Sequence, residues 1–592
     1  MSLILYFVNG GNKLAKRKTI GFLVGGIMDE FIVQLCKGII TESTRDDFNI
    51  IVIPIKYINR EMKDIPDLFE YQYQTSTELI NTNNIDVLLV AADCIGCLTT
   101  KENVNTFIQN LKQKNIPIIL AASKMEGLPG VIFDNKAGII DGMTYLVDEL
   151  GVKNICMLSS VDHNADISER FEAYKEMMDY YKLPIKPNSV ITTNLSVNCK
   201  ADCEKILDLN PDAEAIICAD DAIAIGLYSV MKERGIVPGK DIKVMGFDNS
   251  INASMMTPSL TTVDANAANI GKQVFSMARL LLDGWNIGNK TVPTRFILRD
   301  SFGSILDGEN TDQNILDKDY IDKFFHRIFY KFENTSKQED FAIYVTFKTI
   351  MSFVIDYIND DVYSPERLSL IKTRIREFFK LGALEYTDED IFIAFVDRIR
   401  IAALKRHTEP ERQCQTYEAF SSILEEIIAS MRSVFSEYRD TVYKSLASIK
   451  NLVDETLNIE HGDDSNYTDI LRNLSTFGVK NGFIYIYKEP IAHKYEEEFK
   501  APDTLLIKAA MNDGNTQTIP ADEQEISLSE IYNNPFMEDK KYTLVLMPLY
   551  FRGTLYGSIL YDLTDVSYRG GDYLANQYST AVRIINLINR CN

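Results

Sequence analysis

Residues 215–249 read AIICADDAIAIGLYSVMKERGIVPGKDIKVMGFDN, and this stretch decides the fold. An apolar run at 215–218 is followed by a segment whose apolar residues recur at helical spacing. A second apolar run, 242–245, comes after a turn that contains Gly and Pro. A strand, a helix and a strand with short connections form a βαβ unit, and such units build parallel sheets. The stretch therefore predicts an α/β fold.

Both predicted strands end at acidic residues. Asp220 follows the first strand, and Asp248 follows the second. Open parallel sheets bind ligands at the carboxyl ends of their strands. Carboxylates accept hydrogen bonds from vicinal hydroxyl groups, although they also cap helices. We expect Asp220 and Asp248 to contact a ligand and Asp221 to cap the helix that follows.

The composition bounds the class of protein. A chain of 592 residues predicts roughly three or four domains. The net charge of -22 opposes a broad phosphate-binding face, which argues against direct DNA binding. Nine cysteines, an odd number scattered through apolar stretches, are typical of a reducing compartment. Because residues 1–8 are too short to span a bilayer and no other signal or membrane segment is evident, we expect a cytoplasmic protein without a membrane partner.

The sequence lacks motifs for catalysis and metal binding. The five histidines are dispersed, and neither HExxH, GxSxG nor a phosphate-binding loop occurs. The single CxxC, Cys94 to Cys97, has no second pair and is interpreted as structural. We expect no catalytic residue, no metal site and no cofactor, and we do not expect an enzyme.

The stretch at 215–249 closely resembles the ligand-sensing domain of the LacI/GalR family, a two-lobed fold of periplasmic-binding-protein type. The resemblance extends over residues 19–303 and includes the segments 257–275 and 292–303 near its end. It implies two lobes with parallel sheets. Four continuous apolar runs precede this stretch and predict strands that a parallel sheet buries on both faces. They are 19–24, 49–54, 85–92 and 116–122, with a helix expected near 29–42 and another near 76–83.

The resemblance also implies a set of ligand contacts. Phe31 matches the Phe of the family's Asn-Pro-Phe turn, and Asp134 begins a motif at the first crossing between lobes and caps a helix. Arg170 occupies a position whose arginine commonly faces the ligand in the family, although such an arginine can also only tie down its helix. The expected ligand-binding residues are Phe31, Asp134, Arg170, Asp220 and Asp248.

The chain departs from the family at two places. Where family members often have Asp-Arg, it has Ala122-Ser123, which argues against an ordinary sugar ligand. Residues 1–18 form a leader with no room for the helix-turn-helix that family repressors carry, which again opposes direct DNA binding.

A helical region is expected after a polar linker at 304–319, over residues 320–460. Its last part carries a heptad seam with a four-residue stutter, which indicates either a helix packed on its own domain or a parallel dimer helix that passes on a signal. The seam residues are Phe420, Leu424, Ile427, Met431, Val434, Tyr438, Val442, Leu446, Ile449 and Val453.

The C-terminal part, 465–592, resembles a GAF domain of α+β class. Strands at 482–488 and 504–510 precede a hairpin that turns at Arg552-Gly553, and a long helix at 573–588 closes the chain. A bilin-attachment cysteine and a cyclic-nucleotide motif are both missing, so we expect a structural or dimerising role rather than a second sensor.

These expectations describe a cytoplasmic sensor of a small polar ligand, sugar-like or another metabolite. Closure of two lobes would shift a two-state equilibrium and regulate transcription or signalling. We expect a homodimer, and the arrangement resembles input halves of bacterial GGDEF signalling proteins, with a separate output protein as one option. The alternatives are a LacI/GalR-type DNA-binding regulator and an exported solute-binding protein.

Overall fold

The computed structural model describes residues 17–59, 68–96, 99–160, 165–194, 196–303, 315–329, 332, 338–360, 364–387, 389–457, 459, 463–495 and 497–591. The chain divides into two compact units, and each unit collects segments that are far apart in sequence. Unit 1 comprises 1–133, 266–292 and 441–592, and unit 2 comprises 134–265 and 293–440. Residues 1–16 of the expected leader, most of the expected linker and Cys97 lie outside the described residues.

A parallel sheet forms the N-terminal part of unit 1. Its strands lie in the order β5-β4-β3-β1-β2, and every residue of β1 and β2 is buried. The five strands are β1 (Thr19–Val24), β2 (Asn49–Pro54), β3 (Val87–Val90), β4 (Ile118–Ala121) and β5 (Gly130–Asp134). The prediction of buried parallel strands from continuous apolar runs is thus confirmed.

Two helices of unit 1 approach each other through glycines. Helix α1 (Glu30–Ser43) begins at its N-cap Asp29 and packs against α9 (Ala267–Leu282), which also contacts β3 and β4. A Cβ atom at Gly38 would lie 1.9 Å from the Ala268 carbonyl oxygen. A Cβ at Gly271 would lie 2.1 Å from the Leu35 carbonyl oxygen. Only glycine allows the two backbones to come this close.

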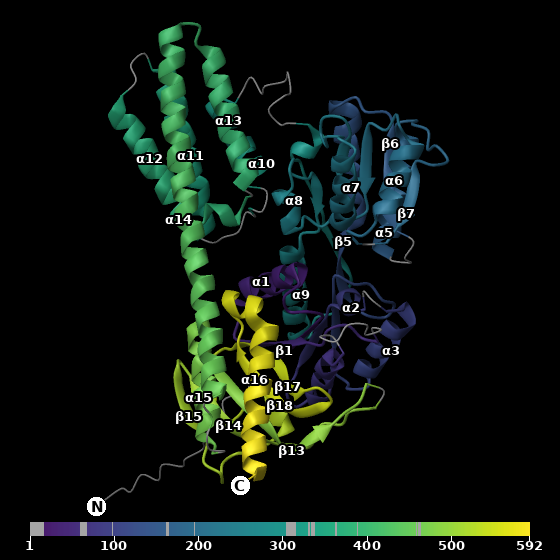
Figure 1. The fold of residues 1–592 in the computed structure, drawn as a ribbon, viewed down its shortest axis with the longest axis vertical. Helices are drawn as coiled ribbons and strands as arrows, with labels where there is room; N and C mark the ends of the chain where they lie inside the picture. Colours follow the sequence, from purple (N-terminus) through teal and green to yellow (C-terminus); the bar gives the residue numbers. More distant parts are fainter. Residues whose placement is uncertain are drawn as a thin grey trace, which may run out of the picture. The chain divides into compact units, whose positions relative to one another are not determined.

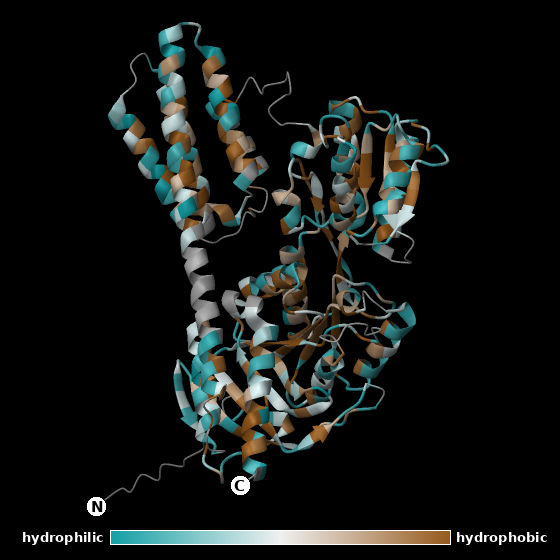
Figure 2. Cartoon of the chain, viewed as in Figure 1, coloured by the Kyte–Doolittle hydropathy of each residue, from teal (hydrophilic) through white to brown (hydrophobic). Residues whose placement is uncertain are grey.

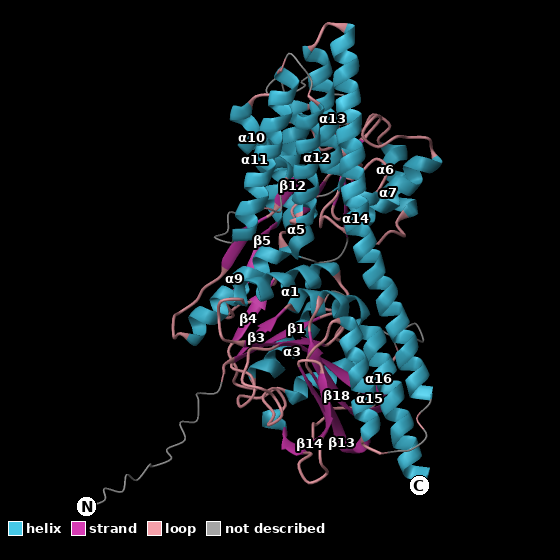
Figure 3. Ribbon diagram, turned by 90° about the vertical axis from the view of Figure 1, so that its left-hand side faces the viewer, coloured by secondary structure: helices cyan, strands magenta, loops and turns pink. Residues whose placement is uncertain are grey.

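The sheet of unit 1 continues into the C-terminal part of the chain. Strand β17 (Thr543–Phe551) pairs in parallel with β2, with Val545 opposite Val52. Beyond β17 the strands are antiparallel, and the whole sheet has 12 strands. The added strands are β18 (Thr554–Asp562), β13 (Gly482–Ala492), β14 (Thr504–Asn512), β15 (Asn515–Thr518) and β16 (Glu525–Ser527), and β11 (Lys290–Pro293) lies at the other edge next to β5. Figures 1 and 3 show β18, β13 and β14 of this C-terminal part below β1.

One hydrophobic core runs through both parts of this sheet. Leu88 and Ile108 from the N-terminal part belong to the same cluster as Phe483, Ile507 and Leu546 from the C-terminal part. In Figure 2 the strands of unit 1 are brown where they pass through this core. Burial of apolar surface on this scale is the main force that holds the two parts together.

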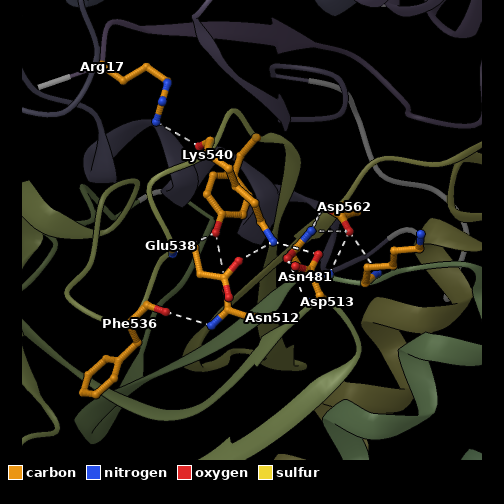
Figure 4. A network of polar contacts seen from close by, with 10 residues as sticks. Arg17, Asn481, Asn512, Asp513, Phe536, Glu538, Lys540 and Asp562 are labelled. Atoms are coloured by element: carbon orange, nitrogen blue, oxygen red, sulfur yellow. Dashed lines mark hydrogen bonds and ion pairs between the residues drawn. The ribbon is translucent and has the colours of Figure 1, made fainter.

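A polar network fixes the segment that leads into β17 (Figure 4). The Lys540 carbonyl accepts a hydrogen bond of 2.9 Å from Nη1 of Arg17, near the start of the parallel sheet. The Lys540 ammonium lies 2.7 Å from Glu538 and 2.8 Å from Asp513. At the first residues of the pairing, the backbone N–H of Tyr542 donates to the Asn49 side chain at 3.0 Å. Polar side chains of Arg17 and Asn49 therefore hold the segment that leads into β17 next to β2.

Helices cover the antiparallel part of unit 1. Helix α15 (Ser465–Arg472) contacts β14, and α16 (Asp565–Cys591) contacts β17 and β18. The predicted hairpin turn at Arg552-Gly553 is present, and Arg552 has a φ of 55° there. The structure thus contains strands and a closing helix as expected, while the resemblance to a GAF domain stays a prediction.

Unit 2 contains a parallel sheet of four strands in the order β7-β6-β8-β9. The predicted βαβ unit is confirmed, because β8 and β9 are neighbours joined through α7, with Ile217 opposite Met245. The elements are β6 (Ile155–Ser160), α5 (Ala165–Tyr180), β7 (Val190–Thr193), α6 (Lys200–Leu209), β8 (Ala215–Cys218), α7 (Asp221–Glu233) and β9 (Lys243–Met245).

Shorter elements complete the two units. The helix expected near 76–83 is instead a 3₁₀ segment, η1 (Glu70–Leu79), in which aromatic and β-branched residues, which lose side-chain freedom in an α-helix, occupy every second position from 71 to 77. The others are α2 (Ala92–Ile95), α3 (Lys101–Lys112), α4 (Asn135–Thr144), the π-turn η2 (Tyr145–Glu149), α8 (Ile251–Met255), β10 (Thr262–Asp264), β12 (Arg295–Ile297), and the 3₁₀ turns η3 (Asp300–Phe302), η6 (Asn473–Phe477) and η7 (Leu528–Glu530).

The described residues between 315 and Leu457 are mainly helical, as predicted. Their apolar core is rich in phenylalanine and isoleucine side chains, among them Phe325, Phe329 and Phe378. The elements are η4 (Lys318–Tyr320), α10 (Ile321–Ile328), α11 (Gln338–Asn359), α12 (Pro365–Lys380), η5 (Ala383–Glu385), α13 (Glu389–Arg406) and α14 (Pro410–Leu457).

The first half of the heptad seam packs inside this region. Phe420, Ile427 and Met431 of α14 are buried in the phenylalanine-rich core, and Val434 packs against it. These residues favour the interpretation of a helix packed on its own domain. The seam side chains from Tyr438 to Ile449 lie outside the described residues, so a dimer helix there stays a prediction.

One described helical segment, Phe341–Asn359 of α11, is long and apolar enough to cross a bilayer by length and composition. Within the helical region its residues Phe347, Met351 and Ile355 are buried in the core. The core helix of a folded domain passes the same test, so this segment is described as a core helix.

Candidate ligand-binding site

Two consecutive acids follow β8, and their side chains do different things. The Asp220 carboxylate accepts a hydrogen bond of 2.7 Å from the backbone N–H of Ile223, so Asp220 is the N-cap of α7. The Asp221 carboxylate instead accepts from the Thr262 hydroxyl at 2.6 Å and from the backbone N–H of Ser250 at 2.7 Å. The prediction that Asp221 caps the helix is therefore wrong. Asp220 has the extended backbone that an N-cap requires, and Asp221 already lies within the helix.

Burial changes the proton affinity of both acids. Asp221 is 2% exposed, and this burial raises its pKa to about 6, against the opposing effects of its hydrogen bonds and of Arg299. Burial likewise raises the pKa of Asp220, while its bond to Ile223 and the charge of Arg170 lower it. Asp221 serves to fix the loop after β9, whereas Asp220 lies at the carboxyl end of β8.

Arg170 of α5 is held by four groups around its guanidinium. Its Nε donates to Asn135 Oδ1 at 3.0 Å, and its Nη1 donates to the Ala219 carbonyl at 2.7 Å. The guanidinium carbon lies 3.5 Å from the centre of the Phe247 ring. Its Nη2 lies 3.6 Å from Asp248 Oδ1. Arg170 thus ties α5 to its neighbours and also faces Asp248. A role in fixing the helix and a role in facing a ligand are therefore compatible for this residue.

Asp248 lies in the loop after β9 with a left-handed backbone, at a φ of 105°. Its backbone N–H donates to the Val263 carbonyl at 2.8 Å, which holds the loop in place. Its side chain is 49% exposed, although the protein packed around it makes burial the largest cause that raises its pKa, to about 8. Arg170 lowers this pKa, and Asp221 and Asp220 raise it. Water at the open half of the Asp248 carboxylate screens these effects, which reduces the shift in pKa without changing its direction.

Asp134 and Asn135 begin α4. The Asp134 carboxylate accepts from the backbone N–H groups of Lys136 at 2.9 Å and Ala137 at 3.2 Å, which confirms its predicted role as a helix cap. Asn135 is 2% exposed and joins Arg170 to two acids of α5. Its Nδ2 donates to Asp166 at 2.9 Å and to Glu169 at 3.0 Å. Asn135 was not among the predicted residues, although it stands next to Asp134 in the same motif.

Arg299 is a second residue that the sequence did not single out. It is 1% exposed, and its Nη1 donates to the Leu260 carbonyl at 3.0 Å. Its Nη2 donates to the Asn249 side chain at 2.8 Å. Arg299 therefore supports the loop that carries Asp248, and its charge lowers the pKa of Asp221. The segment 292–303 resembled the family closely, but nothing in it marked this arginine as buried.

Phe31 belongs to unit 1, whereas the other four predicted residues belong to unit 2. Its backbone N–H donates to the Asp29 carboxylate at 2.9 Å in the first turn of α1. Its ring meets the Phe133 ring edge-on, with 6.3 Å between the centroids. Within unit 2, Arg170 faces Asp248 directly and is joined to the residue after Asp134 through Asn135.

The cluster in unit 2 is suited to bind a polar ligand. One fixed guanidinium lies beside a half-exposed carboxylate, and a second carboxylate lies at the end of the neighbouring strand. Such groups donate to and accept from hydroxyl and amine groups in fixed directions. Among the residues that the structure describes, no group of three His, Cys, Asp or Glu side chains is arranged to hold a metal ion.

Known proteins share this domain. Residues 145–302 match the family model described as "Periplasmic binding protein-like domain". The HTH-type transcriptional regulator RegA of Clostridium saccharobutylicum is 24% identical over 273 residues, which cover 46% of this chain and 77% of RegA. Catabolite control protein A of Priestia megaterium is 24% identical over 261 residues, which cover 43% of this chain and 72% of that protein.

One similar solved structure is that of a regulatory protein of the LacI family from Chloroflexus aggregans. It is 20% identical, with a TM-score of 0.40, and the match covers 48% of this chain and 98% of that one. Residues 145–302 therefore form a periplasmic-binding-protein-like domain, and the chain is similar to these two regulators over somewhat less than half of its length.

Proposed function

We propose that the chain is a sensor of a small polar ligand that regulates transcription or signalling, in the cytoplasm, through closure of its two lobes. The observation that carries this proposal is the cluster in unit 2. Arg170 is fixed by Asn135 and Ala219, so that its Nη2 faces the half-exposed carboxylate of Asp248. A guanidinium held in place before binding loses little entropy when a ligand arrives.

The charges of the cluster favour a ligand with several hydroxyl or amine groups. The charge of Arg170 lowers the pKa of Asp220. The carboxylates of Asp220 and Asp166 raise the pKa of Asp248. These carboxylates outnumber the one guanidinium and oppose an anionic ligand. The proposed ligand contacts include four residues of unit 2, Asp134, Arg170, Asp220 and Asp248. Phe31 is proposed as a further contact.

Helix α14 offers a path for the signal. The chain passes between the units at 133–134, at 265–266 and at 292–293, and it passes a fourth time within α14, at 440–441. A change in the arrangement of the units would therefore act on the middle of a helix of 48 residues. A continuous helix transmits such a displacement to both of its ends. The expected homodimer and a separate output protein would receive the signal there.

The C-terminal part is proposed to have a structural or dimerising role and to resemble a GAF domain. Its sheet and core are continuous with those of the N-terminal lobe, which supports a role as a fixed extension of that lobe. A second candidate function is direct DNA binding, because the relative RegA is named an HTH-type transcriptional regulator. A mobility-shift assay with promoter DNA distinguishes the two: tight, sequence-specific binding by the full chain would favour the second candidate.

The sensor proposal is tested by the thermal unfolding of the full chain in the presence of D-ribose, D-glucose, cellobiose, cytidine and spermidine. A compound at 100 times its dissociation constant stabilises the folded chain by about 2.7 kcal/mol. Asp248→Asn is expected to weaken binding by about tenfold or more, which corresponds to about 1.4 kcal/mol. Asp212→Asn, which alters an exposed carboxylate paired with Lys186, is the matched control and should leave binding unchanged.

Two results would contradict the sensor proposal. One is a compound that stabilises wild type, Asp248→Asn and Asp212→Asn equally, because such a ligand would bind elsewhere. The other is turnover of a bound compound that Asp248→Asn abolishes, because it would identify an enzyme.

A further inference from the structure

Two buried cysteines lie side by side at the start of α6. The Sγ atoms of Cys199 and Cys203 are 3.4 Å apart, and both residues are free thiols. Cys199 is 3% exposed and Cys203 is 0% exposed. Cys199 is the N-cap of the helix, and the backbone N–H of Cys203 donates to its carbonyl at 3.1 Å. The helical turn itself therefore holds the two sulfur atoms in contact.

The two thiols differ in proton affinity. The hydrogen bond with Cys203 is the largest cause that lowers the pKa of Cys199, and the start of a helix also favours a thiolate. The same bond is the largest cause that raises the pKa of Cys203. Cys199 is thus suited to act as the nucleophile, and Cys203 is suited to hold the proton that stabilises it.

The two residues before Cys199, Val197 and Asn198, are exposed, and Val197 is 48% exposed. Because Cys199 itself is buried, an oxidant reaches its sulfur atom only when the surrounding structure opens locally. Exposed loops undergo such local opening far more readily than the core does.

We propose that Cys199 and Cys203 form a reversible dithiol site that hydrogen peroxide oxidises to a disulfide. The Cys199 thiolate attacks one oxygen of hydrogen peroxide, the O–O bond breaks, and a sulfenic acid and one hydroxide form. Cys203 then gives up its proton and attacks the Cys199 sulfur. The S–O bond breaks, the S–S bond forms, and the second oxygen leaves as hydroxide. The two thiols lose two electrons to hydrogen peroxide, and their two protons convert the two hydroxides to water.

The pair lies against the helix that begins at the candidate ligand site. Cys199 Sγ is 3.9 Å from the Ile223 carbonyl in the first turn of α7. A Cβ atom at Gly226, one turn further, would lie 2.4 Å from the same sulfur. Oxidation moves Cys199 Sγ toward Cys203 and so removes a contact from the two turns of α7 that follow Asp220. The dithiol proposal does not depend on the proposed ligand, since its first test measures only the oxidation.

The test is peptide mapping of the full chain after treatment with hydrogen peroxide and alkylation under denaturing conditions. Trypsin cleaves after Lys200, between the two cysteines, and again after Lys205. A disulfide therefore appears as a linked pair of peptides, 183–200 and 201–205, that a reductant separates. Cys156 is the matched control, because it is also buried and its pKa is raised to about 11, so it should remain a thiol. Cys414 is exposed and reports that the peroxide was active.

Three results would overturn the proposal. The first is separate alkylation of Cys199 and Cys203 in a sample in which Cys414 is oxidised. The second is a linked peptide that joins either residue to Cys218 instead, and the third is equal oxidation of Cys156. In Cys203→Ser the disulfide is lost, and a sulfenic acid at Cys199 should react with dimedone; no labelling there would mean that Cys199 is not the nucleophile. Because the mapping is done on wild type, a poorly folded variant leaves the main test intact.

Discussion

The ammonium group of Lys56 lies 2.5 Å from the Asp572 carboxylate, although 516 positions separate the two residues in the chain. Lys56 lies two residues beyond the end of β2, and Asp572 belongs to the closing helix α16. The Tyr73 hydroxyl donates to the other oxygen of Asp572 at 3.0 Å, and Glu70 lies 3.5 Å from Lys56. Next to Asp572, a Cβ at Gly571 would lie 3.1 Å from Ile27, in the turn between β1 and α1. The last helix of the chain is therefore anchored at the carboxyl ends of the first two strands, within unit 1.

Loss of this ion pair should weaken the contact between the two parts of unit 1. Lys56 is 9% exposed and Asp572 is 25% exposed in their side chains. Asp572→Asn leaves a nearly buried ammonium with a weaker partner, and we expect a loss of roughly 2–4 kcal/mol in the free energy of unfolding of unit 1. Hydrogen exchange in peptides that contain β2 and β17 measures this loss. Glu233→Gln, which breaks an exposed pair with Lys200, should change the stability by less than about 0.5 kcal/mol. Equal effects of the two substitutions would contradict the assignment.

Gly38→Ala should destabilise the packing of α1 on α9. The new Cβ would lie 1.9 Å from the Ala268 carbonyl oxygen, which is a backbone atom and cannot rotate away. Alanine is a better helix former by about 1 kcal/mol, but overpacking of this kind costs typically about 1–3 kcal/mol or more. We expect a net loss of about 2 kcal/mol, measured by urea unfolding. Gly26→Ala is the control, because nothing lies within 4 Å of a Cβ there. A stabilised Gly38→Ala variant would show that the helices are further apart than described.

Asp221→Asn should flatten the pH dependence of stability between about pH 4 and pH 6. The pKa of Asp221 is raised to about 6 from an ordinary 3.8, so the folded chain keeps a proton in this range that the unfolded chain has lost. Protonation of Asp221 therefore increases the free energy of unfolding of the wild type. The increase is complete below about pH 4 and is lost as the pH rises through 6. The shift corresponds to at most about 3 kcal/mol. The difference between wild type and variant should fall with pH over this window in parallel urea titrations, and a constant difference would rule out the assignment to Asp221.

A chain that ends at residue 303 should fold poorly by itself. It would leave β2 as an unpaired edge and would expose the apolar residues that pack against Leu546 and Phe483. Exposed edges of buried strands pair with other chains, so we expect aggregation in size-exclusion chromatography. Co-expression with residues 463–592 should restore a monodisperse species. If the short chain is a stable monomer without this addition, the continuous sheet is not required for the fold.

The local parts of the fold were predictable because local signals decide them. β1 and β2 have the predicted boundaries, since each is an apolar run between polar residues. Asp134 was predictable as a helix cap for the same reason. The pairing of β17 with β2 was not, because strand pairing over such a distance leaves no pattern in either segment. The sequence predicted separate successive domains, and their boundaries stay a prediction.

The candidate site was predictable in composition but not in detail. Arg170 and Asp248 face each other, as a shared ligand contact requires. The helix cap was predicted at Asp221 and lies at Asp220, because the direction of two adjacent side chains depends on backbone angles that the sequence does not reveal. Asn135 and Arg299 became evident only from their hydrogen bonds. A buried arginine and an exposed one look alike in a sequence.

The pairing of β17 with β2 has a consequence for synthesis of the chain on the ribosome. The backbone N–H of Tyr542 meets the Asn49 side chain across 493 positions. At about 5–20 residues per second, the ribosome takes roughly 25 to 100 s to make the partner strand after β2 has emerged. During this time the nascent chain presents an apolar strand with a free edge to the cell. Chaperones that shield such edges are expected to bind the chain between these two moments, and a pulse-labelled nascent chain should release them once residue 551 has left the exit tunnel.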